Sequence, residues 1–266
     1  MSEEPKIPLI NFSCHASEFR EGESFTYYHS LGIVISGKLE LNDGQKKRQF
    51  KKGELFSSRK NHLLKYIKHP PDDGEFKSLS LYFDEKVLRD FSSEYNYTAD
   101  KKYQTPAFVS IPPNKVLSSF MQSLLNYSVL LNDEKRTELL RIKQKEALML
   151  LLEYNPILKD TLFDFSEPHK IDLEAFMNKN YRFNVHIDRF AYLTGRSLAT
   201  FKRDFQKTFG TSPRQWLQQK RLHEAHYLIT QKGKTASDIY LDLGFENLSH
   251  FSFSFKKEFG FAPSLA

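Results

Sequence analysis

The sequence predicts an α+β fold in which an antiparallel β domain with a helical hairpin precedes an all-α domain. Short segments alternate apolar and polar residues up to Phe83, and longer segments of helical periodicity follow. A period of two is typical of strands and a period near 3.6 is typical of helices. In addition, phenylalanines near the C-terminus recur at a spacing of 50 residues. Runs of strands followed by runs of helices indicate an α+β chain.

Short strands are expected between residues 31 and 83. An apolar, β-branched run opens at Leu31, and Asp43-Gly44 supplies a hairpin turn because this dipeptide tolerates positive φ. The last segment alternates, with Leu79, Leu81 and Phe83 on one side. Several short strands at this spacing predict an antiparallel sandwich or barrel. We expect residues 1–30 to be partly extended.

Helices are expected after the strands. Asp84 is suited to cap a short helix, and residues 92–115 are expected to be irregular. Two long amphipathic helices, at about 116–131 and 135–154, then form a hairpin around Asn132-Asp133. Their broad apolar faces have two interpretations: they only cover the sheet, or part of them joins two chains into a homodimer.

The charge of the chain is unevenly distributed. The net charge is +6, but residues 1–169 hold 24 Lys and Arg against 24 Asp and Glu, and residues 170–266 hold 15 against 9. A basic segment beside a neutral one favours a polyanion-binding module on a separate body, although chance surface charge is the alternative. Residues 155–169 contain Pro156 and Pro168 and are the expected linker between the two.

Several classes of site are not expected. Cys14 is the single cysteine, which excludes an intramolecular disulfide and a cysteine-based zinc site. The N-terminus has no signal-peptide pattern, and the longest apolar run, Ala147–Leu152, is too short to span a bilayer. We therefore expect a soluble, cytoplasmic protein with no membrane partner and no cofactor.

The repeat near the C-terminus predicts a duplicated helical unit. Five residues of its first copy recur 50 positions later: Phe201, Phe205, Phe209, Gly210 and Pro213 become Phe251, Phe255, Phe259, Gly260 and Pro263. Each copy has a short helix, a glycine turn (Gly195 or Gly244), a capping residue (Ser197 or Asn247) and a second helix. This is the helix-turn-helix pattern, although a plain helical bundle is the alternative. The second copy is expected to be helical over Ala236–Leu243 and Leu248–Phe259.

A longer helix is expected to join the two copies. It opens at Ser212-Pro213 and runs to about Thr230, burying six apolar residues: Trp216, Leu217, Leu222, Ala225, Leu228 and Ile229. About 18 residues span roughly 27 Å. Adjacent major grooves on one side of B-DNA lie about 34 Å apart. Such a helix can place two recognition helices in adjacent grooves of double-stranded DNA, and the shortfall favours bending of the DNA or weak use of one unit.

With these features, residues 170–266 resemble the DNA-binding domain of the AraC/XylS family of bacterial transcription regulators. The motifs are the run Ser197–Gln206, Gly210-Thr211-Ser212-Pro213, Arg221-Leu222-His223-Glu224-Ala225, Ile239–Phe245 and Phe251–Lys256. The resemblance implies a sequence-specific, promoter-binding regulator and, by the family's habit, an activator that works with RNA polymerase.

The resemblance also implies the DNA-contacting residues. The first recognition helix would present Ala199, Lys202, Arg203 and Gln206 to bases, and Ser197, Thr200 and Lys207 to phosphates. Arg203 is the best candidate for a bidentate guanine contact. The second would present Leu248, Ser249, His250 and Ser252, with Lys256 in its last turn.

The chain departs from the family pattern in its second unit. Phe253 stands where an arginine is common, and Tyr240 stands where an alanine is common. Phe253 cannot hydrogen-bond a base edge, although its ring could touch a thymine methyl group. We therefore expect the first unit to make most of the sequence discrimination. Ala266 comes before the aromatic-Arg segment that usually follows in the family, so we expect the last helix to be truncated or altered.

The N-terminal part resembles the cupin-like β-barrel that such regulators carry over residues 1–115, with its helical hairpin at 116–154. In the family this part binds a small effector, dimerises or docks a regulatory protein. Three stretches also look like the regulators of type III secretion genes, which partner proteins control: Ser30–Leu39, Lys52–Leu55 and Gly74–Phe83. Four aromatic residues are suited to line a pocket or to pack the sheet, so no effector-binding residue is assigned: Tyr27, Tyr28, His29 and Tyr66.

A cupin-type metal-dependent enzyme fused to a nucleic-acid-binding module is the competing class. Such sites need a His-x-His pair, a carboxylate and a later histidine. The histidines of the N-terminal part are scattered, with no His-x-His pair: His15, His29, His62 and His69. We therefore expect neither a metal site nor an enzyme.

Overall fold

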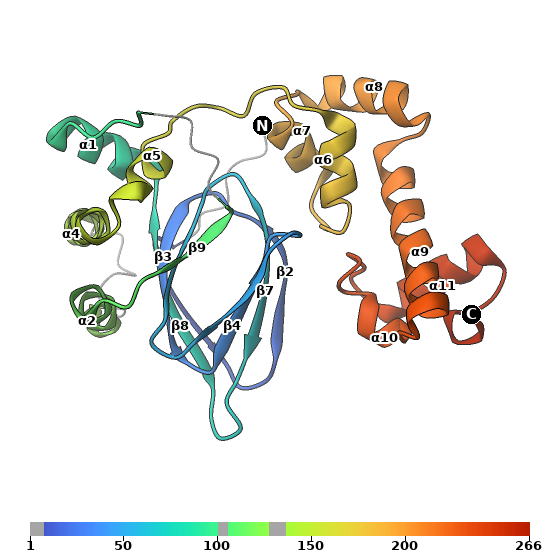
Figure 1. Cartoon of the computed structure of the whole chain (residues 1–266), viewed down its shortest axis with the longest axis horizontal. Coiled ribbons are helices and arrows are strands. Elements are labelled where there is room, and N and C mark those ends of the chain that lie inside the picture. Colours follow the sequence, from blue (N-terminus) through green and yellow to red (C-terminus); the bar gives the residue numbers. More distant parts are fainter. Residues whose placement is uncertain (1–7, 101–105, 128–136) are drawn as a thin grey trace. The chain divides into compact units, whose positions relative to one another are not determined.

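The computed structural model describes residues 8–100, 106–127 and 137–266. It contains two compact units, of which the first ends at Ser166 and the second begins at Glu167 (Figure 1). The described strands of the first unit are β1 (Ile10–His15), β2 (Phe19–Phe25), β3 (His29–Ser36), β4 (Lys38–Asn42), β5 (Lys47–Lys51), β6 (Leu55–Ser58), β7 (Leu63–His69), β8 (Phe76–Phe83) and β9 (Phe108–Ile111).

The strands form two sheets that share an apolar interior. One sheet has the order β1-β8-β3-β6-β9 and the other the order β2-β7-β4-β5. Their registers are antiparallel, as in the pairs Leu31↔Leu81 and Leu39↔Phe50. Side chains of both sheets are buried together, among them Val34, Phe56, Leu39, Phe50 and Leu64. The predicted antiparallel β domain is therefore confirmed, with the two sheets facing each other.

Helices cover the outer face of the first sheet. They are α1 (Glu85–Tyr95), α2 (Lys115–Ser123), η1 (Leu124–Tyr127), α4 (Thr137–Tyr154), η3 (Pro156–Leu158) and α5 (Lys159–Leu162). Side chains alternate along β3, so that Leu31 and Ile33 join a core with the helical residues Leu148 and Leu151. The apolar helix faces thus cover the sheet. The predicted cap of α1 is also present, because the Asp84 carboxylate accepts a hydrogen bond from the Val87 backbone N–H.

Two expectations about the N-terminal unit need correction. Strand β9 lies in a segment expected to be irregular, and it pairs with β6 through Ile111↔Leu55 and its neighbours. The expected linker 155–169 is partly folded, because Leu158, Leu162 and Phe163 are buried in the core under the helices. The expectation that residues 1–30 are partly extended is confirmed, since residues 10–15 form β1 and pair with β8. The expected turn Asn132-Asp133 lies outside the described residues.

His29 is a buried imidazole at the start of β3. It is 1% exposed, and its Nε2 has no hydrogen-bond partner within the described part of the chain. Burial, together with the positive charges of Lys60 and Arg59, lowers the pKa of His29 well below its usual 6.5. The folded unit therefore holds this ring in its neutral form.

The second unit is helical. Its elements are α6 (Leu173–Asn180), α7 (Ile187–Leu193), α8 (Leu198–Phe209), α9 (Pro213–Lys232), α10 (Ala236–Ile239), α11 (Leu248–Phe259) and η4 (Pro263–Leu265). Helix α9 runs between α8 at one end and α10 and α11 at the other (Figure 1). It begins as predicted, with Ser212 accepting from the Gln215 backbone N–H and Pro213 in the first turn.

Two helix predictions differ from the structure. The helix expected over Ala236–Leu243 ends at Ile239, and a turn continues to Gly244, whose N–H donates to the Leu241 carbonyl. This turn brings Leu243 and Phe245 into the core. On α9, three side chains expected to be buried are only half-buried: Trp216, Leu228 and Ile229.

Arg221 is buried in the middle of α9, which the apolar pattern did not predict. Its guanidinium donates to the carbonyl oxygens of Tyr181 at 2.7 Å, Phe183 at 2.9 Å and Gly244 at 3.0 Å. One side chain thus satisfies three backbone acceptors from two loops. It fastens the middle of α9 to the loop after α6 and to the turn of the second helix-turn-helix unit.

We predict that acid destabilises the first unit through His29. Below pH 6.5 the unfolded chain binds a proton on this ring that the folded chain does not bind, so the free energy of unfolding should fall by up to about 1.4 kcal/mol per pH unit. His29→Gln should show a shallower fall. Urea unfolding of the full chain by circular dichroism at pH 7.5, 6.5 and 5.5 measures it, with fluorescence of Trp216 identifying the transition of the second unit. Equal slopes in both proteins would contradict the prediction.

We also predict that Arg221→Leu destabilises the second unit by roughly 3 kcal/mol or more, because it leaves buried carbonyl groups without donors. Arg221→Lys should recover only part of the loss, since an ammonium group cannot match the guanidinium fork. The midpoint of the Trp216 fluorescence transition in urea measures both. Gln218→Ala, an exposed change on the same helix, is the control. A wild-type midpoint for Arg221→Leu would refute the role of this side chain.

Candidate nucleic-acid interface

The second helices of the two repeated units have the same local construction. Helix α8 is capped by Ser197, whose hydroxyl accepts from the Thr200 backbone N–H. Helix α11 is capped by Asn247, whose side chain accepts from the His250 backbone N–H at 2.7 Å. Each helix ends at a glycine with positive φ, at 69° and 85°. The predicted caps are therefore confirmed.

The buried phenylalanines determine which side of each helix faces solvent. Phe201 and Phe205 on α8 are fully buried, as are Phe251 and Phe255 on α11. The third member of each series is only half-buried: Phe209 packs on Trp216, and Phe259 packs on His226. With the i and i+4 positions held inside, the opposite face of each helix points outward.

The exposed face of α8 is basic. Ala199, Lys202, Arg203 and Gln206 are all exposed, at the i, i+3, i+4 and i+7 spacing of one helix face. The Arg203 side chain is 78% exposed, and its Nε lies 3.9 Å from the nearer oxygen of Asp204. This guanidinium can therefore reach a base edge without leaving a buried partner.

The capping residues and the last turn of α8 flank this face. Ser197 and Lys207 are exposed, whereas Thr200 is half-buried. The Ser197 hydroxyl donates to the Thr200 hydroxyl at 3.0 Å. Both hydroxyls thus belong to the cap of the helix, and the Lys207 ammonium at its far end is free to approach a phosphate.

An ion pair behind α8 was missed by the sequence analysis. Arg196 donates to the Asp204 carboxylate at 3.1 Å and to the carbonyls of Ile171 and Thr194 at 3.0 and 2.8 Å. The hydrogen bond from Arg196, with the charge of Lys170, lowers the pKa of Asp204. The pair holds the turn before α8 against the helix. A carboxylate within an otherwise basic helix was the signal that could have found it.

The exposed face of α11 has a different chemistry. Leu248, Ser249 and His250 are exposed on its first turn, and Ser252 is half-buried. Lys256 is exposed in the last turn. Of the predicted DNA-contacting residues, only Thr200 and Ser252 are thus partly covered, and all of them lie on α8, on α11 or at the cap of α8.

The turn before each recognition helix requires glycine. Gly195 has a φ of 64°, and a Cβ there would lie 2.2 Å from the His169 carbonyl carbon. Gly244 has a φ of 82°, and a Cβ there would lie 2.7 Å from the Arg182 carbonyl oxygen. The chain therefore passes so close to other backbone at both turns that a side chain does not fit.

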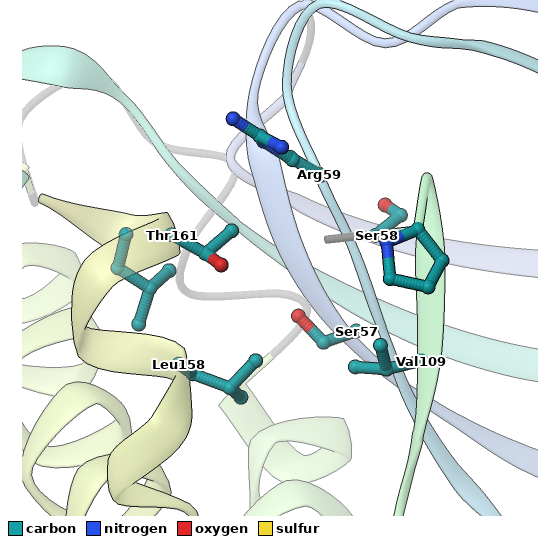
Figure 2. Close-up of a pocket in the computed structure, with 8 residues that line it drawn as sticks. Ser57, Ser58, Arg59, Val109, Leu158 and Thr161 are labelled. Atoms are coloured by element: carbon teal, nitrogen blue, oxygen red, sulfur yellow. The ribbon is translucent and has the colours of Figure 1, made fainter. Parts of the chain in front are cut away.

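The N-terminal β unit contains a small pocket between its helices and its first sheet (Figure 2). Leu158 and Thr161 come from the helical side, and Ser57 and Val109 come from strands β6 and β9. Its interior has room for about one water molecule. Within residues 8–100, 106–127 and 137–266, no group of three His, Cys, Asp or Glu residues is placed to hold a metal ion. In these same ranges, no helix is long and apolar enough to cross a membrane.

Comparison with known proteins agrees with this arrangement. A family model described as the ExsA N-terminal regulatory domain matches residues 29–162, and a helix-turn-helix domain model matches residues 190–265. The HTH-type transcriptional regulator ExsA of Pseudomonas aeruginosa is 26% identical over 258 residues, covering 95% of this chain and 90% of that protein.

Two further proteins are similar. The thermoregulatory protein LcrF of Yersinia pestis is 32% identical over 150 residues, which cover 54% of this chain and 55% of LcrF. A solved apo structure of ToxT from Vibrio cholerae aligns with 97% of this chain and 96% of its own, at 11% identity and a TM-score of 0.47. The chain therefore belongs to the AraC family of DNA-binding transcription regulators and carries an N-terminal regulatory domain of the ExsA family.

Proposed function

We propose that this regulator is a transcription activator that binds one promoter site with both helix-turn-helix units and contacts RNA polymerase from there. The observation that carries the proposal is the pair of exposed recognition faces, on α8 and α11, at the two ends of one helix. Two further similar proteins are described as transcriptional activators, VirF of Yersinia enterocolitica and RhaS of Escherichia coli, and they support the direction of regulation. Such a role requires no catalytic centre.

The length of α9 supports simultaneous use of both units. Its residues, Pro213–Lys232, span roughly 30 Å. Adjacent major grooves on one face of B-DNA lie about 34 Å apart. The helix is therefore slightly shorter than the groove spacing, and we expect the DNA to bend towards the protein when both units bind.

The chemistry of α8 supports base recognition by the first helix-turn-helix unit. Arg203 has the exposure and the planar donor fork for a bidentate contact with guanine. Lys202 and Gln206 lie on the same face and supply further donors. Lys207, at the end of the helix, is suited to a phosphate. We therefore assign most hydrogen-bonded base recognition to α8.

For the N-terminal β unit, which ends at Ser166, we propose a regulatory role through protein contacts. The pocket between β6, β9 and α5 has room for about one water molecule and so does not itself hold a metabolite, and a partner protein is the regulatory signal that we propose. A second copy of the chain is one such partner. On α4, Ile142 is 59% exposed and Met149 is 43% exposed, and the seven-residue spacing puts them on one face. Lys145 and Glu146 lie between them on that face, so the exposed surface of α4 is mixed, with an apolar side chain one turn to either side of two charged ones. These two exposed apolar side chains are the observation that supports dimerisation through the helical hairpin.

We predict that Arg203→Ala weakens binding to the preferred site by about 1–3 kcal/mol and relaxes sequence preference at one position. Fluorescence anisotropy against a selected site and a scrambled duplex measures both effects. Lys207→Ala is the matched control: it should weaken binding to both duplexes alike and flatten the dependence of affinity on salt. Equal affinity of the wild type for selected and scrambled DNA would refute the proposal.

We predict that Ile142→Glu shifts the chain from dimer to monomer, because it replaces the most exposed apolar side chain of α4 by a charge that would have to be buried between two chains. Sedimentation velocity over a range of protein concentrations measures the dissociation constant. Lys86→Glu, an exposed change on α1, introduces the same residue elsewhere and should leave the equilibrium unchanged. Monomeric wild-type protein at all accessible concentrations would exclude this role for α4.

A further inference from the structure

Phe253 occupies in the second unit the place that Arg203 occupies in the first. Each lies six residues after the capping residue of its helix, at 197 to 203 and at 247 to 253. Each is also flanked by two fully buried phenylalanines, two residues before and two residues after it. Because the caps and the buried positions coincide, the two side chains project from equivalent points of α8 and α11.

The Phe253 ring is exposed to a degree that folding does not explain. It is 70% exposed, whereas Phe251 and Phe255 on the same helix are buried. The other phenylalanine rings of α11 contact neighbouring rings in tilted or edge-on geometry, but Phe253 takes part in no ring contact among the described residues. On the same face, Ser249 and Ser252 towards the start of the helix are small, and Lys256 lies one turn further on. The ring is therefore the large apolar group on the face that α11 presents.

A phenyl ring has no donor, acceptor or charge with which to contact a phosphate or a polar base edge. The apolar group that B-DNA displays in the major groove is the C5 methyl group of thymine. We propose that Phe253 recognises thymine in the major groove through this methyl group, so that the second unit contributes sequence discrimination of its own. The inference rests on the proposed function, because it requires α11 to enter a major groove.

The two helix-turn-helix units then differ in the physical basis of their sequence specificity. The base-facing side of α8 carries Lys202 and Arg203, whose contacts are electrostatic and weaken as salt rises. The equivalent side of α11 has Ser252 and Phe253 at these positions, so its base contact depends on burial of apolar surface. Discrimination by the second unit should therefore change little between low and high salt, while discrimination by the first unit falls.

The test begins with a site selected by the full-length wild-type protein from a randomised duplex pool. We expect a thymine about one helical turn away from a guanine. Each thymine is then replaced in turn by uracil, which removes the methyl group and leaves the hydrogen-bonding edges intact. Loss of one buried methyl should weaken wild-type binding roughly fourfold at the contacted position.

Two variants and one further base analogue complete the experiment. In Phe253→Ala the uracil duplex and the thymine duplex should bind equally, and the exposed position leaves the fold unchanged, which the Trp216 fluorescence transition verifies. Phe253→Arg should exchange the preference for thymine for one for guanine and steepen the salt dependence. Replacement of guanine by 7-deazaguanine removes the N7 acceptor and should affect wild type and Phe253→Ala but not Arg203→Ala.

The outcomes separate the inference from the function on which it rests. If 7-deazaguanine matters and uracil does not, the first unit discriminates sequence and the inference about Phe253 is wrong. If neither analogue matters and selection finds no preferred site, the proposed function itself fails. If Phe253→Ala binds every duplex as the wild type does but loses transcription activation, the ring contacts a protein, and this also overturns the inference.

Discussion

The burial of phenylalanines at i and i+4 on two helices is the constraint on which the DNA-binding unit depends. Phe201 and Phe205 set the rotation of α8, and Phe251 and Phe255 set that of α11. Once those rings are inside, Lys202 and Arg203 on α8 and Phe253 on α11 face outward. The same apolar contacts that stabilise the unit thus decide which side chains of the two helices are exposed. Between the two ends, Arg221 inside α9 donates to three carbonyl groups and holds the second turn in place.

The duplicated scaffold has diverged in its exposed chemistry rather than in its core. The first unit adds the pair Arg196–Asp204 behind a basic face. The second has a buried serine, Ser254, at the position equivalent to Asp204, and it presents Phe253 where the first presents Arg203. One helix is therefore suited to hydrogen-bonded and electrostatic recognition, and the other to an apolar contact. Under the function that we propose, such a division would let two similar folds distinguish different bases within one site.

In the N-terminal β unit, both faces of the first sheet are buried. Strand β3 carries side chains to both faces of its sheet, so that Leu31 packs under the helices while Val34 packs against the second sheet. The helices that close the outer face bury one side and leave Ile142 and Met149 exposed. The N-terminal unit thus leaves two apolar side chains exposed on a helix that packs on its first sheet. His29 is a buried, neutral ring, so the free energy of unfolding of this unit is expected to fall in acid.

The sequence by itself determined the class of fold, the duplicated helical unit and the faces on which α8 and α11 bury their phenylalanines. These follow from local signals: periodicity, capping residues such as Ser197 and Asn247, and glycines at fixed spacing. Only the tertiary structure decided the burial of Arg221, the Arg196–Asp204 pair and the pairing of β9 with β6. Each of these depends on partners far away in the chain. A charged residue is buried where distant carbonyl groups meet it, and an irregular segment becomes a strand where a sheet edge lies open beside it.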